Sequence, residues 1–259
     1  MDRGRFTLVK WYMDCVTEDG EVAVLYCVDL HWGRIHARYS SALTAGERPP
    51  ESHASMAGYR VSASEGEIAV EAPRLKAEGN WRADAPPVRQ MVYQSDAGEV
   101  EWNCLQPRSL VQLRIGERAW NGLGYAECLT VTVPPWKLPM RQLRWGRFVS
   151  PENSLAWVDW QGGHSTSFAV HNGRTVETLA VSDAEVAVPG ATLTMEEPLP
   201  LRTGRLASTV LPGLSALGGL LPRSLFNIEE HKWRSRGRLA AQEQSSRGWV
   251  IHEVVDWNV

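Results

Sequence analysis

The sequence lacks the motifs of the common cofactor and metal sites. Its 259 residues contain no G-x-S-x-G element, no P-loop and no strand–helix dinucleotide fingerprint. The seven histidines show neither H-x-x-x-H nor H-E-x-x-H spacing. Gly122-Leu123-Gly124 is an isolated G-x-G with no helix after it, which we interpret as a tight turn. We therefore predict that the protein uses no cofactor and no metal ion.

Long apolar runs are also scarce. The longest, residues 211–221, is interrupted by one proline and three glycines and is too short to span a bilayer. The first residues enter a strand pattern directly, without the apolar segment of a signal peptide, so we expect a cytoplasmic protein. Residues 212–226 are compatible with a short helix, and the sequence shows no long amphipathic helix.

Neither charge sign is in excess, because the formal net charge is only -3. This balance gives no electrostatic reason to expect nucleic acid or an anionic membrane as a partner. The four cysteines include no C-x-x-C pair, and each falls in a strand-like segment where a reduced thiol behaves as a small apolar residue. That pattern fits a reducing compartment, and two disulfides are the alternative.

The sequence does contain a succession of short strand patterns separated by turn signals. Asn172-Gly173 is the strongest hairpin signal, and Pro86-Pro87 places a loop at residues 80–87. Many short strands at this spacing are typical of a sandwich or barrel, so we predict an all-β protein with little helix. The predicted strands are residues 6–16, 21–30, 34–41, 56–63, 67–72, 74–77, 88–94, 99–104, 110–115, 125–133, 141–149, 154–160, 166–171, 175–181, 185–189, 191–196, 205–211, 232–240 and 248–257.

Prolines at positions 134, 135 and 139 divide the chain almost in half. Each half is long enough for a closed up-and-down barrel of about eight strands, and closure removes exposed strand edges. We therefore predict two tandem antiparallel β-barrels, residues 1–134 and residues 139–259. A single large open β-structure is the alternative, since no convincing sequence repeat relates the halves.

Glu127 is the anomalous residue of the best-defined strand. After Gly124 the alternation puts Tyr125 and Glu127 on one otherwise apolar face. An ionised glutamate buried there must be paired, partly hydrated or protonated. It is either a general acid, with Tyr125 as hydrogen-bond partner, or half of an ion pair to Arg144 or Arg147. Trp102 lies on the inward face of a preceding strand, where it would line the same cavity as Glu127.

The predicted hairpin at residues 141–160 supplies a second candidate site. With its turn centred near Asn153, one face carries Trp145 and Arg147 beside Trp157 and Asp159. Arg147 would then lie opposite Trp157 and diagonal to Asp159. The group is either a polar anchor in a tryptophan-walled pocket or a charge pair that braces the hairpin. A one-residue shift in register would separate the four residues.

Several short segments together resemble the lipocalin-like group that contains the carotenoid 1,2-hydratases, or hydroxyneurosporene synthases. The resemblance is carried by EWNC at 101–104, GLGYAE at 122–127, LRWGRF at 143–148 and WVDWQG at 157–162. It implies a tandem of two calycin-type barrels. The hydratases pair a His-x-Trp with a later Gly-Tyr-x-Asp. Here Trp102 and Tyr125 match, Glu127 replaces the aspartate, Val100 replaces the histidine, and CLTVT replaces the polar run that follows.

We therefore expect a protein that binds an apolar small molecule, isoprenoid- or lipid-like, in a barrel cavity. If it is an enzyme, the resemblance and the residues predict cofactor-free acid–base chemistry: hydration, cyclisation or isomerisation. Glu127 would be the proton donor and Tyr125 its partner. The predicted substrate-binding residues are Trp102, Trp145, Arg147, Trp157 and Asp159. The alternatives are a non-catalytic carrier and an interaction module with a filled barrel. Twelve tryptophans fit both a lined pocket and a packed core.

Overall fold

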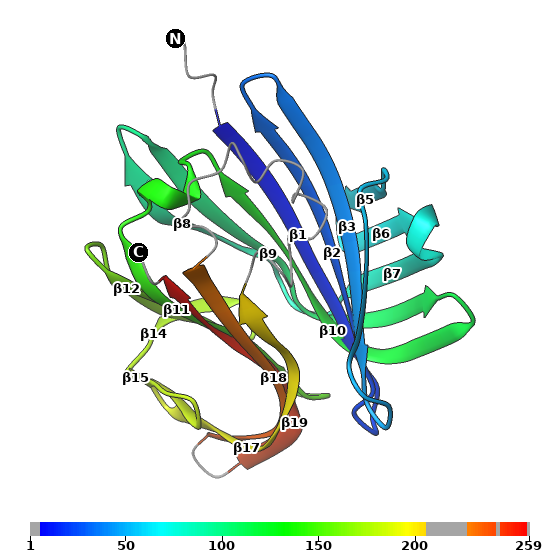
Figure 1. Cartoon of the computed structure of the whole chain (residues 1–259). Helices are drawn as coiled ribbons and strands as arrows, with labels where there is room; N and C mark the ends of the chain where they lie inside the picture. The colour runs from blue at the N-terminus through cyan, green and yellow to red at the C-terminus, as the bar shows by residue number, and fades with distance from the viewer. Residues whose placement is uncertain (1–5, 206–226, 242–243, 258–259) are drawn as a thin grey trace. The chain divides into compact units, whose positions relative to one another are not determined.

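A computed structural model describes residues 6–205, 227–241 and 244–257 of the chain. The protein is all-β, as predicted, and consists of two tandem lipocalin-like antiparallel barrels (Figure 1). The chain divides into two compact units between Leu138 and Pro139. The exact domain limits, residues 1–134 and 139–259, stay a prediction. The expected short helix at residues 212–226, and most of the expected strand at 205–211, lie outside the described residues.

The described residues of the first barrel form ten strands and two short 3-10 helices. Its sheet runs in the order β4-β3-β2-β1-β10-β9-β7-β6-β5, and β8 pairs with β9 beside this path. The elements are β1 (Phe6–Val16), β2 (Val22–Trp32), β3 (Ile35–Ala45), β4 (Glu51–Ser55), β5 (Arg60–Ser64), β6 (Glu67–Ala72), η1 (Pro73–Leu75), β7 (Ala77–Ala83), β8 (Val88–Ser95), β9 (Gly98–Ile115), β10 (Arg118–Val131) and η2 (Pro135–Lys137).

In the described part of the chain, the second barrel has nine strands in the order β14-β13-β12-β11-β19-β18-β17-β16-β15. Its strands are β11 (Met140–Val149), β12 (Ser154–Gly162), β13 (Thr166–His171), β14 (Arg174–Glu177), β15 (Ala180–Val181), β16 (Glu185–Val188), β17 (Ala191–Arg205), β18 (Ile228–Ala241) and β19 (Gln244–Trp257). Within the described residues, no helix has the length and apolar character needed to cross a membrane.

The two sheets share one topology. Apart from β8, neighbouring strands in each follow the chain order, and the first strand pairs with the last: β1 with β10, and β11 with β19. The two ends of each path are again consecutive in the chain, β4 with β5 and β14 with β15. This is the order of an up-and-down barrel interrupted at an equivalent place in each half. The halves are therefore related in topology, although no sequence repeat relates them.

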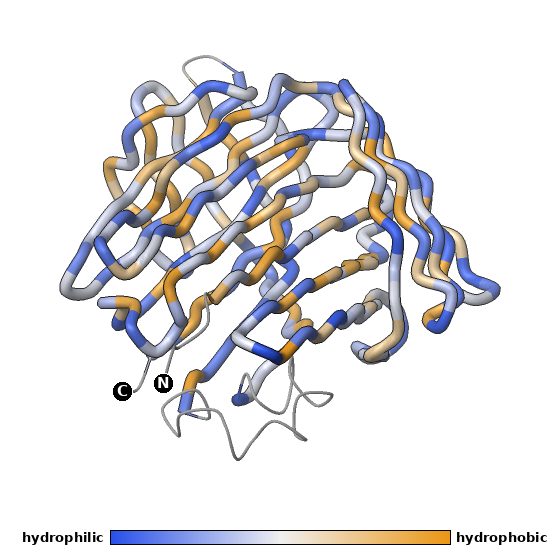
Figure 2. Tube along the Cα trace, turned by 90° about the horizontal axis from the view of Figure 1, so that it is seen from above, coloured by the Kyte–Doolittle hydropathy of each residue, from blue (hydrophilic) through white to orange (hydrophobic). Residues whose placement is uncertain are grey.

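The interior of the first barrel is filled by apolar side chains. Trp81, fully buried, donates from Nε1 to the carbonyl oxygen of Asp14 at 2.7 Å, although their strands are not neighbours. Every second side chain of a strand faces the same side of the sheet, so the interior residues alternate with residues of the other face. Figure 2 shows hydrophobic and hydrophilic residues succeeding one another along the strands. The buried interior cluster consists of Met13, Cys15, Ala23, Leu25, Cys27, Ala42, Ile68, Val70, Ala72, Ala77, Trp81, Val111, Leu113, Trp120 and Ala126.

The second barrel has its own apolar interior. The buried interior cluster consists of Phe148, Leu155, Trp157, Ala169, Val186, Val188, Ala191, Leu193, Met195, Leu239 and Val250.

The hairpin of β13 and β14 forms at the predicted Asn172-Gly173 turn, where both residues have positive φ, 49° and 73°. Positive φ at both central positions is the type I′ geometry, which matches the twist of the flanking strands.

Several local predictions were wrong. Residues 74–77, expected as a strand, lie mostly in η1 and the turn after it, and residues 56–59 lie between β4 and β5 rather than in a strand. Residues 80–83, expected in a loop, belong to β7 because Trp81 anchors them in the interior. The two strands expected on either side of Pro107 are one strand, β9. Gly122 and Gly124, expected in a tight turn, lie within β10.

Candidate functional site

A bulge in β9 shapes the first candidate site. The pairing of β9 with β10 shifts twice, between Gly124 and Ala126 and between Ala126 and Glu127, so β9 carries extra residues opposite this stretch. Pro107, which has no N–H to give to the ladder, falls in the irregular part. Bulges are where a strand tolerates proline and where a side chain is redirected, often beside active sites. The irregularity lies directly opposite Tyr125 and Glu127.

Close packing against β1 explains the two glycines of β10. A Cβ at Gly122 would lie 2.1 Å from the carbonyl oxygen of Val16, and one at Gly124 would lie 2.1 Å from that of Asp14. Only glycine permits this approach of two backbones. The backbone of the Glu127 strand is therefore held tightly between β1 and β9.

Glu127 is at the centre of a buried hydrogen-bond network. The hydroxyl of Tyr125 donates to its Oε2 at 2.7 Å, and Nε1 of Trp102 donates to the same oxygen at 2.5 Å. Only 6% of the Glu127 surface and 2% of the Trp102 surface are exposed, and Tyr125 is fully buried. The structure thus brings together three residues selected from the sequence.

Among the described residues, the neighbours of Tyr125 and Glu127 include aromatic and sulfur-bearing side chains. Tyr12 lies opposite Glu127 on β1, and its ring makes edge contacts with Tyr125 and Tyr26 at centroid distances of 6.0 and 5.3 Å. Cys104, buried as a free thiol, forms a hydrogen bond with Tyr125.

Burial fixes the protonation of the two groups beside Glu127. It raises the pKa of Tyr125 well above its usual range, and nearby Cys104 and Glu127 raise this pKa further. Burial likewise raises the pKa of the Cys104 thiol. Both groups therefore keep their protons at neutral pH, because the charged forms are poorly solvated. Tyr125 is a hydrogen-bond donor here rather than a base.

The expectation that Glu127 faces the barrel interior was wrong. Met13 and Ala126 belong to the interior cluster, whereas Tyr12 and Glu127, each one residue away, face the opposite side of the sheet. The face that carries Glu127 is nevertheless buried. Sequence alternation separated the two faces correctly but could not show which of them is enclosed by the barrel.

The predicted register of the β11–β12 hairpin was wrong by one residue. Arg147 pairs with Ala156, while Trp157 pairs with Gly146. The reason is the turn: Val149 pairs with Ser154, which leaves a four-residue loop closed by a 2.8 Å bond from the N–H of Ser150 to the carbonyl of Asn153. The expected pairing and the observed pairing differ by one residue. Such a shift moves every residue of β12 to the face of the sheet opposite the expected one.

The four residues expected to share a face therefore lie on two faces. Arg147, fully buried, donates from Nη1 to the carbonyl of Trp249 at 2.9 Å, and it shares its face with Trp145. Trp157 faces the interior of the second barrel. Asp159, on the same side as Trp157, accepts a hydrogen bond of 2.9 Å from Gln161. The expected Arg147–Asp159 contact is not formed, and Arg144, a considered partner for Glu127, pairs with Asp183.

A buried ionic cluster near Trp145 was missed by sequence reasoning. Lys232, 1% exposed, forms ion pairs with Glu253 and Glu230, and its Nζ lies 5.2 Å from the centre of the Trp145 ring. Arg202 donates to Glu230 at 2.6 Å. The period of two places Glu230 and Lys232 on one face of β18. Only the pairing of β18 with β19 brings Glu253 alongside, and the sequence does not specify that pairing.

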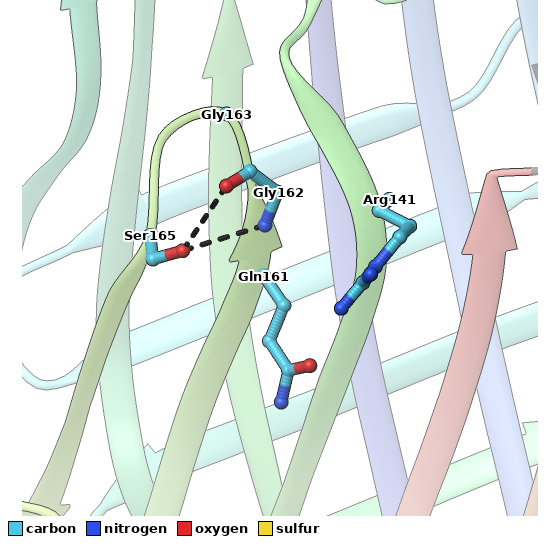
Figure 3. Close-up of a pocket in the computed structure, with 5 residues that line it drawn as sticks. All are labelled: Arg141, Gln161, Gly162, Gly163 and Ser165. Atoms are coloured by element: carbon cyan, nitrogen blue, oxygen red, sulfur yellow. Dashed lines mark hydrogen bonds between the residues drawn. The ribbon is translucent and has the colours of Figure 1, made fainter.

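One pocket of the second barrel includes Gln161, the hydrogen-bond partner of Asp159, in its lining. It has a volume of about 450 Å³ and lies between the start of β11 and the loop after β12 (Figure 3). Ser165 forms hydrogen bonds with both backbone groups of Gly162 at its rim. Its lining, Arg141, Gln161, Gly162, Gly163 and Ser165, is mostly polar and small, and none of the predicted site residues belongs to it.

Comparison with solved structures supports the lipocalin-like fold. Kievitone hydratase from Nectria haematococca aligns with a TM-score of 0.60 at 11% identity, over 97% of this chain and 90% of its own. CghA with Sch210972 aligns with a TM-score of 0.58 at 11% identity, over 97% and 88%. A protein described as an AttH from Nitrosomonas europaea aligns with a TM-score of 0.56 at 9% identity, over 98% and 93%.

These likenesses extend over nearly the whole chain and show a shared fold. No protein-family model matches the sequence, and no curated protein matches it either. Identities near 10% leave the residues of the site to be argued from the chain itself.

Proposed function

We propose that this protein binds an apolar small molecule and acts on it by cofactor-free proton transfer at Glu127. One observation carries the proposal: a buried carboxyl group receives hydrogen bonds from Tyr125 and Trp102 on a single oxygen, Oε2. Two converging donors fix the orientation of the carboxyl group, and orientation is the first requirement of a general acid. The binding surface in this proposal is the face of β1, β9 and β10 that carries Glu127.

In this proposal Glu127 gives up the proton of its carboxyl group while Oε2 accepts the hydrogen bonds of Tyr125 and Trp102. Tyr125 stays protonated because burial raises its pKa. It therefore continues to donate to Oε2 before and after proton transfer, which stabilises the carboxylate that forms.

The reaction that fits these groups is protonation of a carbon–carbon double bond. The π electrons of a trisubstituted alkene form the new C–H bond with the Glu127 proton, and the more substituted carbon becomes a cation. Tyr12, the cross-strand partner of Glu127, packs against Tyr26 and Tyr125, and an aromatic face in this group would attract such a cation. Water adds to the cation, and the Glu127 carboxylate takes the proton that this water loses. The sum is alkene plus water to tertiary alcohol. Loss of a different proton instead gives an isomer.

Two comparisons favour this reaction class without deciding it. One structure of the same fold is a hydratase by name, kievitone hydratase. The sequence resemblance to the carotenoid 1,2-hydratases retains Trp102 and Tyr125, and it places Glu127 where those proteins have an aspartate. The histidine of those proteins is replaced by Val100, so the resemblance covers only part of their site.

An acyclic carotene presented in detergent micelles is the first substrate probe, because its end groups are trisubstituted alkenes. Products heavier by one water are counted by liquid chromatography and mass spectrometry. We expect the wild type to form such a product and Glu127→Gln, which keeps the shape but has no acidic proton, to lose at least ~100-fold in rate. Glu117→Gln removes an exposed carboxylate from the neighbouring turn and should leave the rate unchanged.

A non-catalytic carrier is the alternative. In that case wild type and Glu127→Gln bind the carotene equally, measured by quenching of tryptophan fluorescence, and neither converts it or other trisubstituted alkenes. Conversion by the wild type that survives in Glu127→Gln would contradict the proposed role of Glu127.

A further inference from the structure

A cluster outside the candidate site has the composition of a metal centre. Asp29, His31 and His36 place one carboxylate oxygen and two imidazole nitrogens within 4.8 Å of one another. Two histidines and one carboxylate are the ligand set of many zinc and other transition-metal sites. The three residues belong to the first barrel, on β2 and β3, and play no part in the chemistry proposed at Glu127.

The hairpin explains why these side chains meet. His31 and His36 are directly paired across the β2–β3 hairpin, whose turn contains Gly33 with φ of 60°. Asp29 lies two residues before His31 and so faces the same side of the sheet. The sequence spacing H-x-x-x-x-H carries no helical metal signature, but on a tight hairpin it makes the two histidines cross-strand neighbours.

The geometry is close to that of a bound ion. Nε2 of His31 and Nε2 of His36 both lie 3.0 Å from the same oxygen, Oδ1 of Asp29. Ligands at 2.0–2.2 Å from a tetrahedral zinc ion are about 3.3 Å apart, so both of these separations match edges of such a site. The two imidazole rings are stacked, with centroids 4.0 Å apart and planes inclined by 16°. Stacked rings hold their in-plane Nε2 lone pairs nearly parallel, so the rings must rotate before both Nε2 atoms can face one ion beside Oδ1.

A nearby arginine leaves the ligand oxygen available. Nε of Arg38 lies 3.4 Å from Oδ2 of Asp29, the carboxylate oxygen that the histidines do not approach. Arg38 is held there by the carbonyl oxygen of Tyr59, at 2.8 Å, and lies over the Tyr59 ring. The guanidinium group therefore lies on the Oδ2 side of the carboxylate, and Oδ1 is the oxygen nearest the histidines. Both histidine side chains are about half exposed, 55% and 52%, so an ion can enter from solvent.

We propose that Asp29, His31 and His36 form a binding site for a divalent transition-metal ion of the zinc class. Imidazole nitrogen favours such ions over Mg²⁺ and Ca²⁺, which prefer all-oxygen sites. The three protein ligands leave a coordination position to water or to an exogenous ligand. Cys27, Asp29 and His31 alternate along β2 and so lie on the same face of the sheet, and Cys27 belongs to the interior cluster. The proposed ion therefore lies at the end of the interior face of the first barrel, where that face is exposed to solvent.

The test is calorimetric titration of ZnSO₄ into untagged, chelator-treated protein. We expect one equivalent of Zn²⁺ per chain for the wild type and no heat with MgSO₄. His31→Ala and His36→Ala should each weaken Zn²⁺ binding by more than ~10-fold. Replacing a residue that merely hydrogen-bonds to a metal ligand already lowers metal affinity by about that factor. The matched control is His53→Ala, because His53 is an exposed histidine of the same barrel, near Glu51 but without a second histidine.

Circular dichroism verifies that the variants are folded, and His31→Gln and His36→Gln replace any alanine variant that is not. Co²⁺ in place of Zn²⁺ gives an independent spectroscopic readout: the wild type should show the visible bands of a tetrahedral site and the histidine variants should not. Three results would overturn the proposal. They are no Zn²⁺ binding by the wild type, unchanged affinity in the His31 and His36 variants, and an equal loss of affinity in His53→Ala.

Discussion

Tyr125 donates a hydrogen bond of 2.7 Å to Glu127, two residues further along the same strand. Alternation puts both side chains on one face, and the bulge of β9 opposite them leaves room for Trp102 to reach the same carboxylate oxygen. A phenol, an indole and a carboxyl group are thus held by two adjacent strands.

Removing the Tyr125 hydroxyl should weaken both stability and activity. Tyr125→Phe keeps the ring but deprives Glu127 of one donor in a buried site, so we expect a loss of about 1–3 kcal/mol in the free energy of unfolding, measured in urea. Turnover of the carotene probe should fall as well, because the carboxylate formed after proton transfer loses a stabilising donor. Unchanged stability and unchanged turnover in this variant would show that the hydrogen bond has no energetic role.

Gly124 should tolerate no side chain. A Cβ there would lie 2.1 Å from the carbonyl oxygen of Asp14 and 2.6 Å from Val111. Gly124→Ala must separate β1 from β10, and we expect a destabilisation of about 1–3 kcal/mol by urea unfolding. Gly58→Ala is the matched control, since its nearest contact, Arg38, would lie at an ordinary 3.5 Å. Equal stability of the two alanine variants would contradict the close packing.

His252 should make the protein less stable in mild acid. Burial lowers the pKa of His252 to about 4, and its Nε2 lies 3.0 Å from the hydroxyl of Ser235. A histidine has a pKa near 6.5 in the unfolded chain, so below that pH the unfolded state binds the extra proton and the folded state does not. The stabilisation is complete above about pH 6.5 and is lost as the pH falls toward 4, by about 3 kcal/mol in total.

The measurement compares urea unfolding of the wild type and His252→Gln at several pH values between 7 and 4. Carboxyl groups titrate in both proteins, so the informative quantity is the difference in their pH dependence. The wild type should lose more stability on acidification than the variant. Parallel curves would mean that His252 is not buried in its neutral form.

Arg147 and Asp159 should be energetically independent. They lie on opposite faces of the β11–β12 hairpin, and Arg147 bonds to the carbonyl of Trp249 instead. In a double-mutant cycle with Arg147→Met and Asp159→Asn, the two effects on unfolding free energy should add to within about 0.5 kcal/mol. A coupling free energy above about 1 kcal/mol would show that Arg147 and Asp159 interact, as expected from the sequence.

The sequence was sufficient for those features that depend on local alternation. The first strand was predicted at residues 6–16 and is observed as Phe6–Val16, and the Asn172-Gly173 hairpin formed as expected. The all-β class followed from the same patterns. Side chains of a strand alternate between its two faces, so the placement of Tyr125 and Glu127 on one face could also be predicted from the sequence.

Features that depend on how distant strands align were not accessible. The four-residue turn after Val149 changed the register of β12, and the sequence alone did not reveal its length. Trp81 was assigned to a loop because Pro86-Pro87 dominated the local pattern, whereas its ring fills the barrel. The partners of Lys232 and the convergence of His31 and His36 both require a cross-strand register.

The most direct test of the account follows the proton itself. Carotene and protein are incubated in D₂O, and the position of deuterium in the product is determined by mass spectrometry and NMR. Wild type should place one deuterium on the carbon next to the new hydroxyl-bearing carbon, because exchange with solvent loads the Glu127 carboxyl with deuterium before transfer. Glu127→Gln should give no product while Glu117→Gln matches the wild type. Deuterated product formed by Glu127→Gln at the wild-type rate would contradict proton transfer by Glu127.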